Sequence, residues 1–481
     1  MCPVNSHSQG GRVLDTTQLF ALFALLVGCA LPLAAAAQPE FEGPQLDVDI
    51  TQAEIEARTH TLNTLRSAGR RVFSTPFNKA DGHGDGPMDP SDPTALGGRP
   101  TLQDNGTFLR FNGLDSQTCL ECHSILSNRT IPATFGVGGA GSASANAFPG
   151  VVAPDIADTA NNGFAAISGR IINPPILLGA GGIELVGKEM TTDLQDLLDH
   201  ALDHPNVVIS LDAKGVNFGT LVCDEAGACD MSNVQGLEED LVVRPFGRKG
   251  EFISTRQFDQ GALQFHLGMQ PVEIVELLGR GPDPDGDGVE NEITVGQLSL
   301  LSIFITTLER PIQLQPNGKA RNGERLFDEI GCADCHVPML KTQSRTLGLA
   351  FPEIGHDPSA NVYYSMNLSK KPTGFDRSGS GLRVPMFADL KRHDMGEALA
   401  ESTGSDLASM FTTARLWGVA DSAPYLHDGR ALTISAAILL HGGEAEASAA
   451  AFDNLSDTDI EAVLAFLNTL RNPSKVGRDL D

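Results

Sequence analysis

Two short motifs limit what this 481-residue chain can fold into more than any other feature. Residues 119–123 read CLECH and residues 332–336 read CADCH, so both follow the pattern C-x-x-C-H. Two cysteines at this spacing lie on one side of a helical turn. There each can form a thioether with a haem vinyl group, while the next histidine reaches the iron. The motifs therefore predict two haem c groups, with attachment at Cys119, Cys122, Cys332 and Cys335 and axial ligation by His123 and His336.

The N-terminus has the pattern of an export signal. Residues 18–37 read QLFALFALLVGCALPLAAAA and end in small residues, which is typical of a secretory signal with an A-x-A cleavage site. We therefore predict a signal peptide over residues 1–37 and a mature protein in the periplasm. Two alternatives remain: residues 26–29 also fit a lipobox in which Cys29 would be lipidated, and about 20 apolar residues are long enough for an uncleaved anchor.

The net charge of the chain limits which classes of molecule it can bind. The chain has 61 acidic and 34 basic residues, which gives a formal net charge of −27. A field of this sign repels nucleic acids and anionic lipid surfaces, so we expect no nucleic-acid partner and no membrane contact beyond a lipid anchor. It attracts basic proteins, and we therefore expect a small redox protein as electron donor or acceptor.

The remaining cysteine pair lies in a short acidic loop. Cys223 and Cys229 are six positions apart, and no histidine or further cysteine nearby completes a metal site. In an oxidising compartment this spacing favours a disulfide.

Similar helical patterns recur in both halves of the chain. Residues 319–338 show the apolar spacing of a cytochrome c N-terminal helix before the second haem motif. Residues 455–473 read as a closing helix, with Ser456 as N-cap and Asp459 three positions later, and residues 294–311 end in a similar way. We therefore predict a mainly α fold of two tandem cytochrome c-like domains with long irregular loops. The predicted boundaries are an acidic entry segment at 38–61, an N-terminal domain with a large insertion at 62–312, a C-terminal domain at 313–474 and a tail at 475–481.

Longer segments resemble one known family. They include NPPILLGAGGIELV (173–186), RPFGRKGEF (244–252), ADLKRHDMGEAL (388–399), LWGVADSAPYLHDGRALTI (416–434) and LLHGGEA (439–445). With the haem motifs, they resemble the bacterial di-haem c-type oxidoreductases related to di-haem cytochrome c peroxidases, also labelled thiol oxidoreductases. The resemblance implies a reactive N-terminal haem at His123, where peroxide or oxygen reacts, and an electron-transferring C-terminal haem at His336.

The same resemblance suggests a second ligand for the C-terminal haem. In the peroxidase branch the corresponding A-P-Y-M-H-D-G segment has a methionine, whereas this chain has Leu426, which cannot bind iron. His427, the next residue, is our candidate axial ligand, and it can also serve as a hydrogen-bonding group only. Tyr425, Met395 and His393 remain alternatives.

Catalysis is predicted at Glu184. The resemblance places this residue over the open face of the reactive haem, where a carboxylate takes a proton from bound peroxide and returns it to the departing oxygen. The alternative is a surface charge in a glycine-rich turn. Arg248 either stabilises developing negative charge or forms a structural ion pair. Trp417 is the one tryptophan in the chain, and it departs from relatives that place a tryptophan in the N-terminal half.

Residues 283–292 read DPDGDGVENE, in which carboxylates alternate. Such spacing favours Ca²⁺, and the candidate ligands are Asp283, Asp285 and Asp287. The loop departs from an EF-hand because Thr294 occupies position twelve, so an acidic surface loop is the alternative. In a second acidic stretch, at 81–93, His83 is a candidate distal ligand of the first haem.

These features predict a periplasmic di-haem oxidoreductase with peroxidase-like activity. A non-catalytic electron carrier and an oxidant of a protein or polymer are the alternatives. The thiol oxidoreductase label receives little support, because no reactive cysteine is left in the predicted mature chain.

Overall fold

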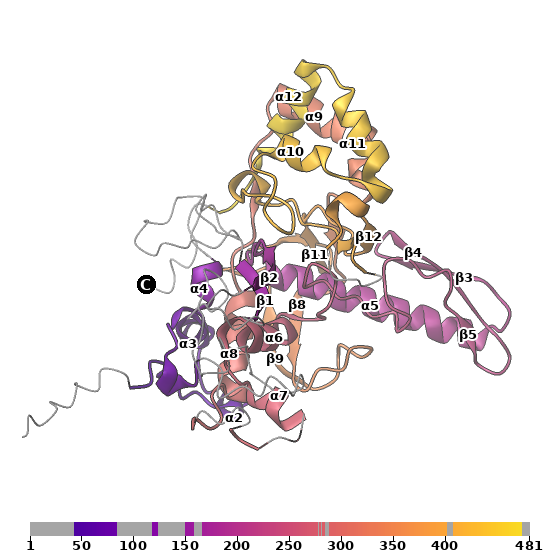
Figure 1. Cartoon of the computed structure of the whole chain (residues 1–481). Helices are drawn as coiled ribbons and strands as arrows, with labels where there is room; N and C mark the ends of the chain where they lie inside the picture. Colours follow the sequence, from indigo (N-terminus) through magenta and orange to yellow (C-terminus); the bar gives the residue numbers. More distant parts are fainter. Residues whose placement is uncertain are drawn as a thin grey trace, which may run out of the picture. The chain divides into compact units, whose positions relative to one another are not determined.

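The computed structural model describes residues 43–83, 118–123, 150–157, 166–277, 279, 281–283, 288–401 and 407–473 (Figure 1). The predicted signal peptide, Cys29, Asp285 and Asp287 lie outside these ranges. Within them, no helix is both long enough and apolar enough to cross a membrane.

Two helices in the N-terminal half cross at a glycine. These are α3 (Leu62–Ser74), which begins after the N-cap Thr61, and α8 (Val295–Thr306), which begins after a capping box of Thr294 and Gln297. A Cβ atom at Gly69 would lie 2.0 Å from the carbonyl oxygen of Leu300. A side chain at position 69 would therefore push the two helices apart.

A second crossing of the same kind lies in the C-terminal half. It joins α9 (Gly318–Glu329) and α12 (Asp457–Leu467), and a Cβ atom at Gly323 would lie 1.8 Å from the carbonyl oxygen of Ala462. The predicted N-cap is confirmed, since the Ser456 hydroxyl accepts a hydrogen bond from the backbone N–H of Asp459. In each half, the first helix of the pair precedes a C-x-x-C-H motif.

Helix α5 (Ala180–Asp203) carries Glu184 and packs against α8. It begins after Gly179, whose φ of +80° favours glycine, and a Cβ atom at Gly181 would lie 2.1 Å from the Thr306 carbonyl oxygen. This close approach buries the first two turns of α5. The remaining α-helices are α2 (Gln52–Glu56), α4 (Cys119–Cys122), α6 (Thr255–Leu267), α7 (Val272–Leu277), α10 (Ile434–Leu439) and α11 (Glu446–Asp453). The 3₁₀ helices are η1 (Lys79–Asp81), η4 (Cys332–Asp334), η5 (Glu397–Leu399), η6 (Val419–Asp421) and η7 (Gly443–Ala445).

The prediction of a mainly α fold is wrong. Helices make up 37% of the structure and strands 16%, and the described strands form six small sheets of two or three strands each. The pairs are β1–β2, β12–β13, β14–β6 and β8–β9, and the three-stranded sheets are β10–β11–β7 and β3–β4–β5. The strands are β1 (Gly150–Ala157), β2 (Ala166–Ile172), β3 (Ile209–Ala213), β4 (Val216–Cys223), β5 (Cys229–Asp230), β6 (Ile312–Gln313), β7 (Leu340–Lys341), β8 (Thr346–Ala350), β9 (Val362–Asn367), β10 (Asp376–Ser378), β11 (Gly381–Val384), β12 (Arg392–Asp394), β13 (Met410–Thr412) and β14 (Leu470–Arg471).

The β3–β4 hairpin shows the physical reason for this error. Residues alternate between buried and exposed along β3, which is the period of a strand with one covered face. Lys214 and Gly215 both have positive φ, as the tight turns of two-residue hairpins require. The predicted disulfide is confirmed, because Cys223 on β4 is bonded to Cys229 on β5. The predicted fold, with long irregular loops between helices, does not include this hairpin.

Buried apolar residues form two clusters. The smaller one surrounds the α9–α12 crossing and includes Phe327, Phe387 and Phe466, and all its residues lie between 326 and 470. The larger one contains α3, α5 and α8 together with strands from residues 340–390. The domain boundary at 312 stays a prediction.

Candidate haem-binding sites

The N-terminal C-x-x-C-H motif is attached to the end of α3. Thr118 caps α4, and its hydroxyl donates a hydrogen bond to the Phe73 carbonyl oxygen at 2.9 Å. His123 follows α4, with Nδ1 at 3.2 Å from the Pro175 carbonyl oxygen. Burial lowers the pKa of His123 to about 4. The imidazole is therefore neutral, with its proton on Nδ1 and the lone pair of Nε2 available for a metal.

The C-terminal motif has the same arrangement. Residues Cys332–Asp334 form η4, and the backbone N–H of His336 bonds to the Cys332 carbonyl oxygen at 3.0 Å. Nδ1 of His336 lies 3.2 Å from the Phe387 carbonyl oxygen. Burial, with a smaller contribution from His441, lowers the pKa of His336 to about 4. This imidazole is likewise neutral, and its Nε2 is available.

A second imidazole faces His336. The ring centroids of His336 and His441 are 6.4 Å apart. Nδ1 of His441 lies 2.8 Å from the Ala437 carbonyl oxygen, and burial lowers the pKa of His441. Metal–imidazole bonds are roughly 2 Å long, so one metal ion between two Nε2 atoms accounts for a centroid separation of about this size. The two residues fit the axial ligand pair of one haem iron.

His441 was missed in the sequence. It lies in LLHGGEA, a segment that we matched to the family without assigning a role to its histidine. The available signal was position, because His441 lies two residues beyond the end of the apolar helix α10.

His427, our candidate ligand, is held differently. Its ring stacks on Phe411 with centroids 4.4 Å apart, and Nε2 lies 3.8 Å from a carboxylate oxygen of Asp428. Its carbonyl oxygen accepts a hydrogen bond from the backbone of Asn173 at 2.7 Å. Burial lowers the pKa of His427. The structure thus brings His441, rather than His427, into ring contact with His336, and ligation by His427 stays a prediction.

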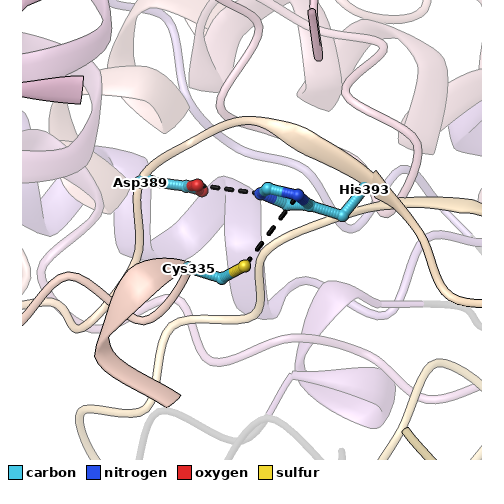
Figure 2. A group of neighbouring side chains, drawn as sticks. All are labelled: Cys335, Asp389 and His393. Atoms are coloured by element: carbon cyan, nitrogen blue, oxygen red, sulfur yellow. Dashed lines mark hydrogen bonds and ion pairs between the residues drawn. The ribbon is translucent and has the colours of Figure 1, made fainter. Parts of the chain in front are cut away.

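Two of the three alternative ligands, His393 and Tyr425, are occupied by protein groups. Nε2 of His393 bonds to Asp389 at 2.8 Å (Figure 2). Nδ1 bonds to Glu444 at 2.8 Å, so neither nitrogen offers a lone pair. The Tyr425 hydroxyl donates to the Val419 carbonyl oxygen at 3.1 Å. The Sγ atom of Cys335 lies 3.9 Å from His393, which gives the group the composition of a metal site. As a haem thioether, however, Cys335 has no thiolate to bind a metal.

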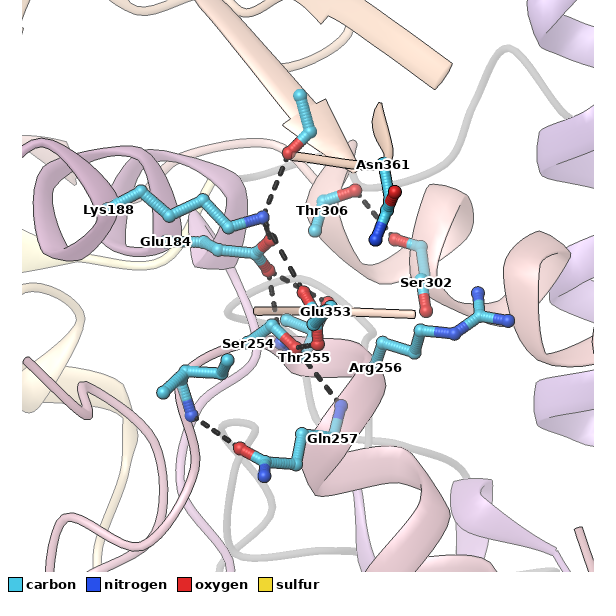
Figure 3. Close-up of polar contacts among 12 residues, drawn as sticks. Glu184, Lys188, Ser254, Thr255, Arg256, Gln257, Ser302, Thr306, Glu353 and Asn361 are labelled. Atoms are coloured by element: carbon cyan, nitrogen blue, oxygen red, sulfur yellow. Dashed lines mark hydrogen bonds and ion pairs between the residues drawn. The ribbon is translucent and has the colours of Figure 1, made fainter. Parts of the chain in front are cut away.

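Glu184 is fully buried in an ionic network (Figure 3). One carboxylate oxygen accepts from Lys188 at 2.7 Å, and the other accepts from the backbone N–H and the hydroxyl of Thr255, each at 3.0 Å. Lys188 also donates to the Gly348 carbonyl oxygen at 2.8 Å and lies 3.7 Å from Glu353. The structure therefore excludes the alternative of a surface charge at position 184.

The neighbouring charges divide into paired and neutral groups. Burial lowers the pKa of Lys188, but the charges of Glu184 and Glu353 outweigh this and raise it. Burial, and then the charge of Glu184, raise the pKa of Asp259 well above its usual value. Lys188 is therefore charged, and the surroundings of Asp259 favour its protonated form.

Arg248 and Trp417 each contact other side chains of the protein. Arg248 pairs with Glu401, which is the structural ion pair that we had kept as an alternative. Trp417 is 2% exposed, lies 6.2 Å from the Phe375 ring and touches the position of Gly179 at the start of α5. Trp417 therefore lies where the C-terminal half contacts the helix that carries Glu184.

The calcium loop is described only in part. The backbone N–H of Gly288 donates to Asp283 at 3.1 Å, and Thr294 caps α8. Position twelve of the loop is thus used by the helix. His83 is buried, and its backbone N–H bonds to the Asn78 carbonyl oxygen at 3.0 Å. Calcium binding and ligation by His83 stay predictions.

Two half-buried, neutral histidines with carbonyl-bound Nδ1 atoms, each after a cysteine pair, define a c-type haem protein. Residues 281–470 match the family described as “Di-haem oxidoreductase, putative peroxidase”. This match confirms the resemblance seen in the sequence, over a segment that makes up less than half of the chain. A search of curated proteins found no match.

Among solved structures, the chain is similar to a MauG-like protein associated with microbial copper homeostasis. The identity is 11% over 63% of this chain and 92% of that chain, with a TM-score of 0.30. It is also similar to hydrazine synthase of Kuenenia stuttgartiensis, at 15% identity over 54% of this chain and 78% of that chain, with a TM-score of 0.24. Scores of this size mark remote similarity, and the function proposed below rests on the residues and on the family match.

Proposed function

We propose that this chain is a periplasmic di-haem c-type oxidoreductase with peroxidase-like activity. The observation that supports it best is the pairing of His336 with His441 at 6.4 Å, because two imidazole ligands suit an iron that only exchanges electrons. Haem bound at these motifs would supply redox-active iron, held by His123 at the site proposed to react with peroxide or oxygen and by His336 at the site proposed to pass electrons. The two motifs would then have different tasks, as the resemblance implies.

The chain fixes both proximal imidazoles through backbone carbonyls. Pro175 accepts from His123 and Phe387 accepts from His336, which sets the tautomer and the ring orientation of each. Carbonyl oxygens are neutral acceptors and leave the imidazoles uncharged. Both histidines are therefore ready to bind iron without first losing a proton.

Glu184 is our proposed proton acceptor. Thr255 holds one carboxylate oxygen with two hydrogen bonds, whereas a single bond from Lys188 holds the other. The oxygen bonded to Lys188 can take up a proton when that bond opens, and Lys188 then remains bound to Gly348 and close to Glu353. The carboxylate would return this proton to the departing oxygen of peroxide.

The net charge of the chain indicates what kind of protein exchanges electrons with it. At −27, the chain favours a basic redox protein, and the encounter should slow as salt is added. Calcium at Asp283, Asp285 and Asp287 is part of the proposal, since this loop precedes α8 and contributes to its start.

The test is electron paramagnetic resonance and absorption spectroscopy of the purified holoprotein, oxidised and reduced, with and without cyanide. The proposed function requires one low-spin haem that ignores cyanide and one haem that binds cyanide and reacts with peroxide. Two low-spin haems that remain closed in both redox states would identify an electron carrier instead. Peroxide-dependent oxidation of a protein or polymer, in the absence of a small electron donor, would favour a macromolecular substrate.

A further inference from the structure

Asn173 hydrogen-bonds one segment of the C-terminal half through both its backbone and its side chain. Its backbone N–H donates to the His427 carbonyl oxygen at 2.7 Å. Its side-chain Nδ2 donates to the carbonyl oxygens of Pro424 and Leu426, at 2.8 and 2.9 Å. These acceptors lie 251 and 253 positions away in the sequence. Asn173 therefore joins the two halves of the chain at three points of the segment 424–427.

The side-chain amide of Asn173 can adopt only one orientation here. An oxygen in the place of Nδ2 would face two carbonyl oxygens, and none of these three atoms could donate a hydrogen bond. The amide oxygen, Oδ1, is buried and has no hydrogen-bond partner among the described residues. The side chain is therefore held in this part of the structure by the two bonds from Nδ2.

Two residues further along, the same segment holds the imidazole of the N-terminal haem motif. The Pro175 carbonyl oxygen lies 3.2 Å from Nδ1 of His123. The residue between is Pro174, so proline rings fix φ at about −65° at both positions after Asn173. A residue that precedes proline is itself restricted to extended conformations. The segment 173–175 is therefore stiff, and the position of the Pro175 carbonyl depends on where Asn173 is held.

The acceptor segment belongs to the surroundings of the C-terminal haem motif. Tyr425 packs against the smaller apolar cluster, as Cys332 does. Leu426 has a φ of +71°, which a leucine keeps only when its neighbours enforce it. Its carbonyl oxygen also accepts a hydrogen bond from the backbone N–H of Gly429 at 3.2 Å. Asn173 is thus bonded to a constrained part of the C-terminal half.

We infer that Asn173 is a positioning residue for His123, and that through it the C-terminal half helps to shape the N-terminal haem site. The inference rests on haem c at His123, which is part of the proposed function. A carbonyl that accepts from Nδ1 makes the imidazole a more basic ligand, and a more basic ligand favours oxidised iron. Without the bonds from Nδ2, the Pro175 carbonyl loses its fixed position and its bond to His123 weakens. The midpoint potential of the N-terminal haem then rises.

The experiment compares N173A with N217A by optical redox titration of the holoprotein. Asn217 is the matched control, because its Nδ2 also donates two hydrogen bonds, to Ser210 at 3.0 Å and to Asp212 at 2.9 Å, on the β3–β4 hairpin. In N173A we expect a higher midpoint potential for the N-terminal haem, and in N217A we expect none of this rise. An unchanged or lower potential in N173A, or an equal rise in both variants, would overturn the inference.

A double-mutant cycle tests the link to the C-terminal half. L426G removes the backbone constraint at one of the two acceptors of Nδ2, and it should also raise the potential of the N-terminal haem. In the N173A background the same substitution should add nothing, because the bond between the two residues is already lost. Additive shifts would mean that Leu426 acts independently of Asn173 and would contradict the link.

Two further measurements separate this inference from the proposed function. The variant C119A/C122A lacks the N-terminal attachment site, so its spectrum assigns the two midpoint potentials without reference to peroxide or cyanide. Two closed low-spin haems would refute the proposed activity, yet the effect of N173A on the N-terminal potential would still be measured. If N173A does not fold, N173L keeps the approximate size of the side chain without its donors and should show the same rise. A natural potential in N173L would contradict the inference.

Discussion

The imidazoles of His336 and His441 face each other with ring centroids 6.4 Å apart, and each directs Nδ1 at a backbone carbonyl oxygen. The two acceptors, Phe387 and Ala437, belong to different parts of the C-terminal half. Both rings are held by backbone rather than by mobile side chains. One iron between them would be fully ligated.

Replacing His441 should therefore open the C-terminal haem. In His441→Ala we expect the low-spin signal of this haem to give way to a high-spin signal, and the haem should then bind cyanide. His441→Met should keep it low-spin and raise its midpoint potential, because methionine favours reduced iron. Absorption spectroscopy, electron paramagnetic resonance and redox titration measure these changes.

His427→Ala is the matched control. If His441 is the ligand, this variant retains the low-spin signal, since His427 stacks on Phe411 and has no ring contact with His336 in the described structure. Loss of the low-spin signal in His427→Ala, with no loss in His441→Ala, would restore the ligand that the sequence predicted.

Glu184→Gln should slow peroxide turnover by about 10²–10⁴-fold, the usual contribution of a general acid–base group. The substitution keeps the shape of the side chain and its bonds from Thr255, but it removes the charge that Lys188 faces. Both haem spectra should be unchanged in the resting protein. Stopped-flow measurement of the peroxide reaction provides the rate.

Glu353→Gln serves as the control for charge loss in the same network, because Glu353 lies 3.7 Å from Lys188 and bonds to Ser254. We expect a smaller effect on turnover from this variant. Equal losses in the two variants would mean that Glu184 acts through the ionic network and does not transfer the proton itself.

Gly323→Ala should destabilise the C-terminal half. The new Cβ atom would lie 1.8 Å from the Ala462 carbonyl oxygen, so α9 and α12 would have to separate. Overpacking of this kind costs about 1–3 kcal/mol. Gly318→Ala is the control on the same helix, since nothing lies within 4 Å of its Cβ position. Denaturant unfolding should show a lower midpoint for Gly323→Ala only, and equal midpoints would rule out the tight crossing.

The sequence predicted the parts of this protein that depend on local chemistry. Residue type and short spacing predict the haem motifs, the Ser456 cap and the Cys223–Cys229 disulfide. The structure confirms the cap and the disulfide. The strands were missed because most are short and are paired with partners distant in sequence. The pairing of β6 with β14 joins residues 312–313 to residues 470–471, and no local pattern reports it.

The site shows the same limit. The sequence motif favours His427 as the ligand. His441 is recognised as a candidate only from the fold, which places its ring 6.4 Å from the ring of His336.

Stability should fall with rising pH because of His393. Burial would lower the pKa of this imidazole, but its bonds to Asp389, Cys335 and Glu444 raise the pKa from 6.5 to about 11. A pKa that is higher in the folded chain means that the imidazolium stabilises the fold fully below about pH 6.5. This contribution is then lost as the pH rises towards 11. Denaturant unfolding of the natural protein should therefore give free energies that decrease over this range.

His393→Gln should be less stable at pH 6, and its free energy of unfolding should change less with pH up to pH 11. His60→Gln is the control, because that half-buried histidine lies 3.7 Å from a single carboxylate, that of Glu54. An identical slope in the natural protein and His393→Gln would mean that the two carboxylates do not hold a charged imidazole.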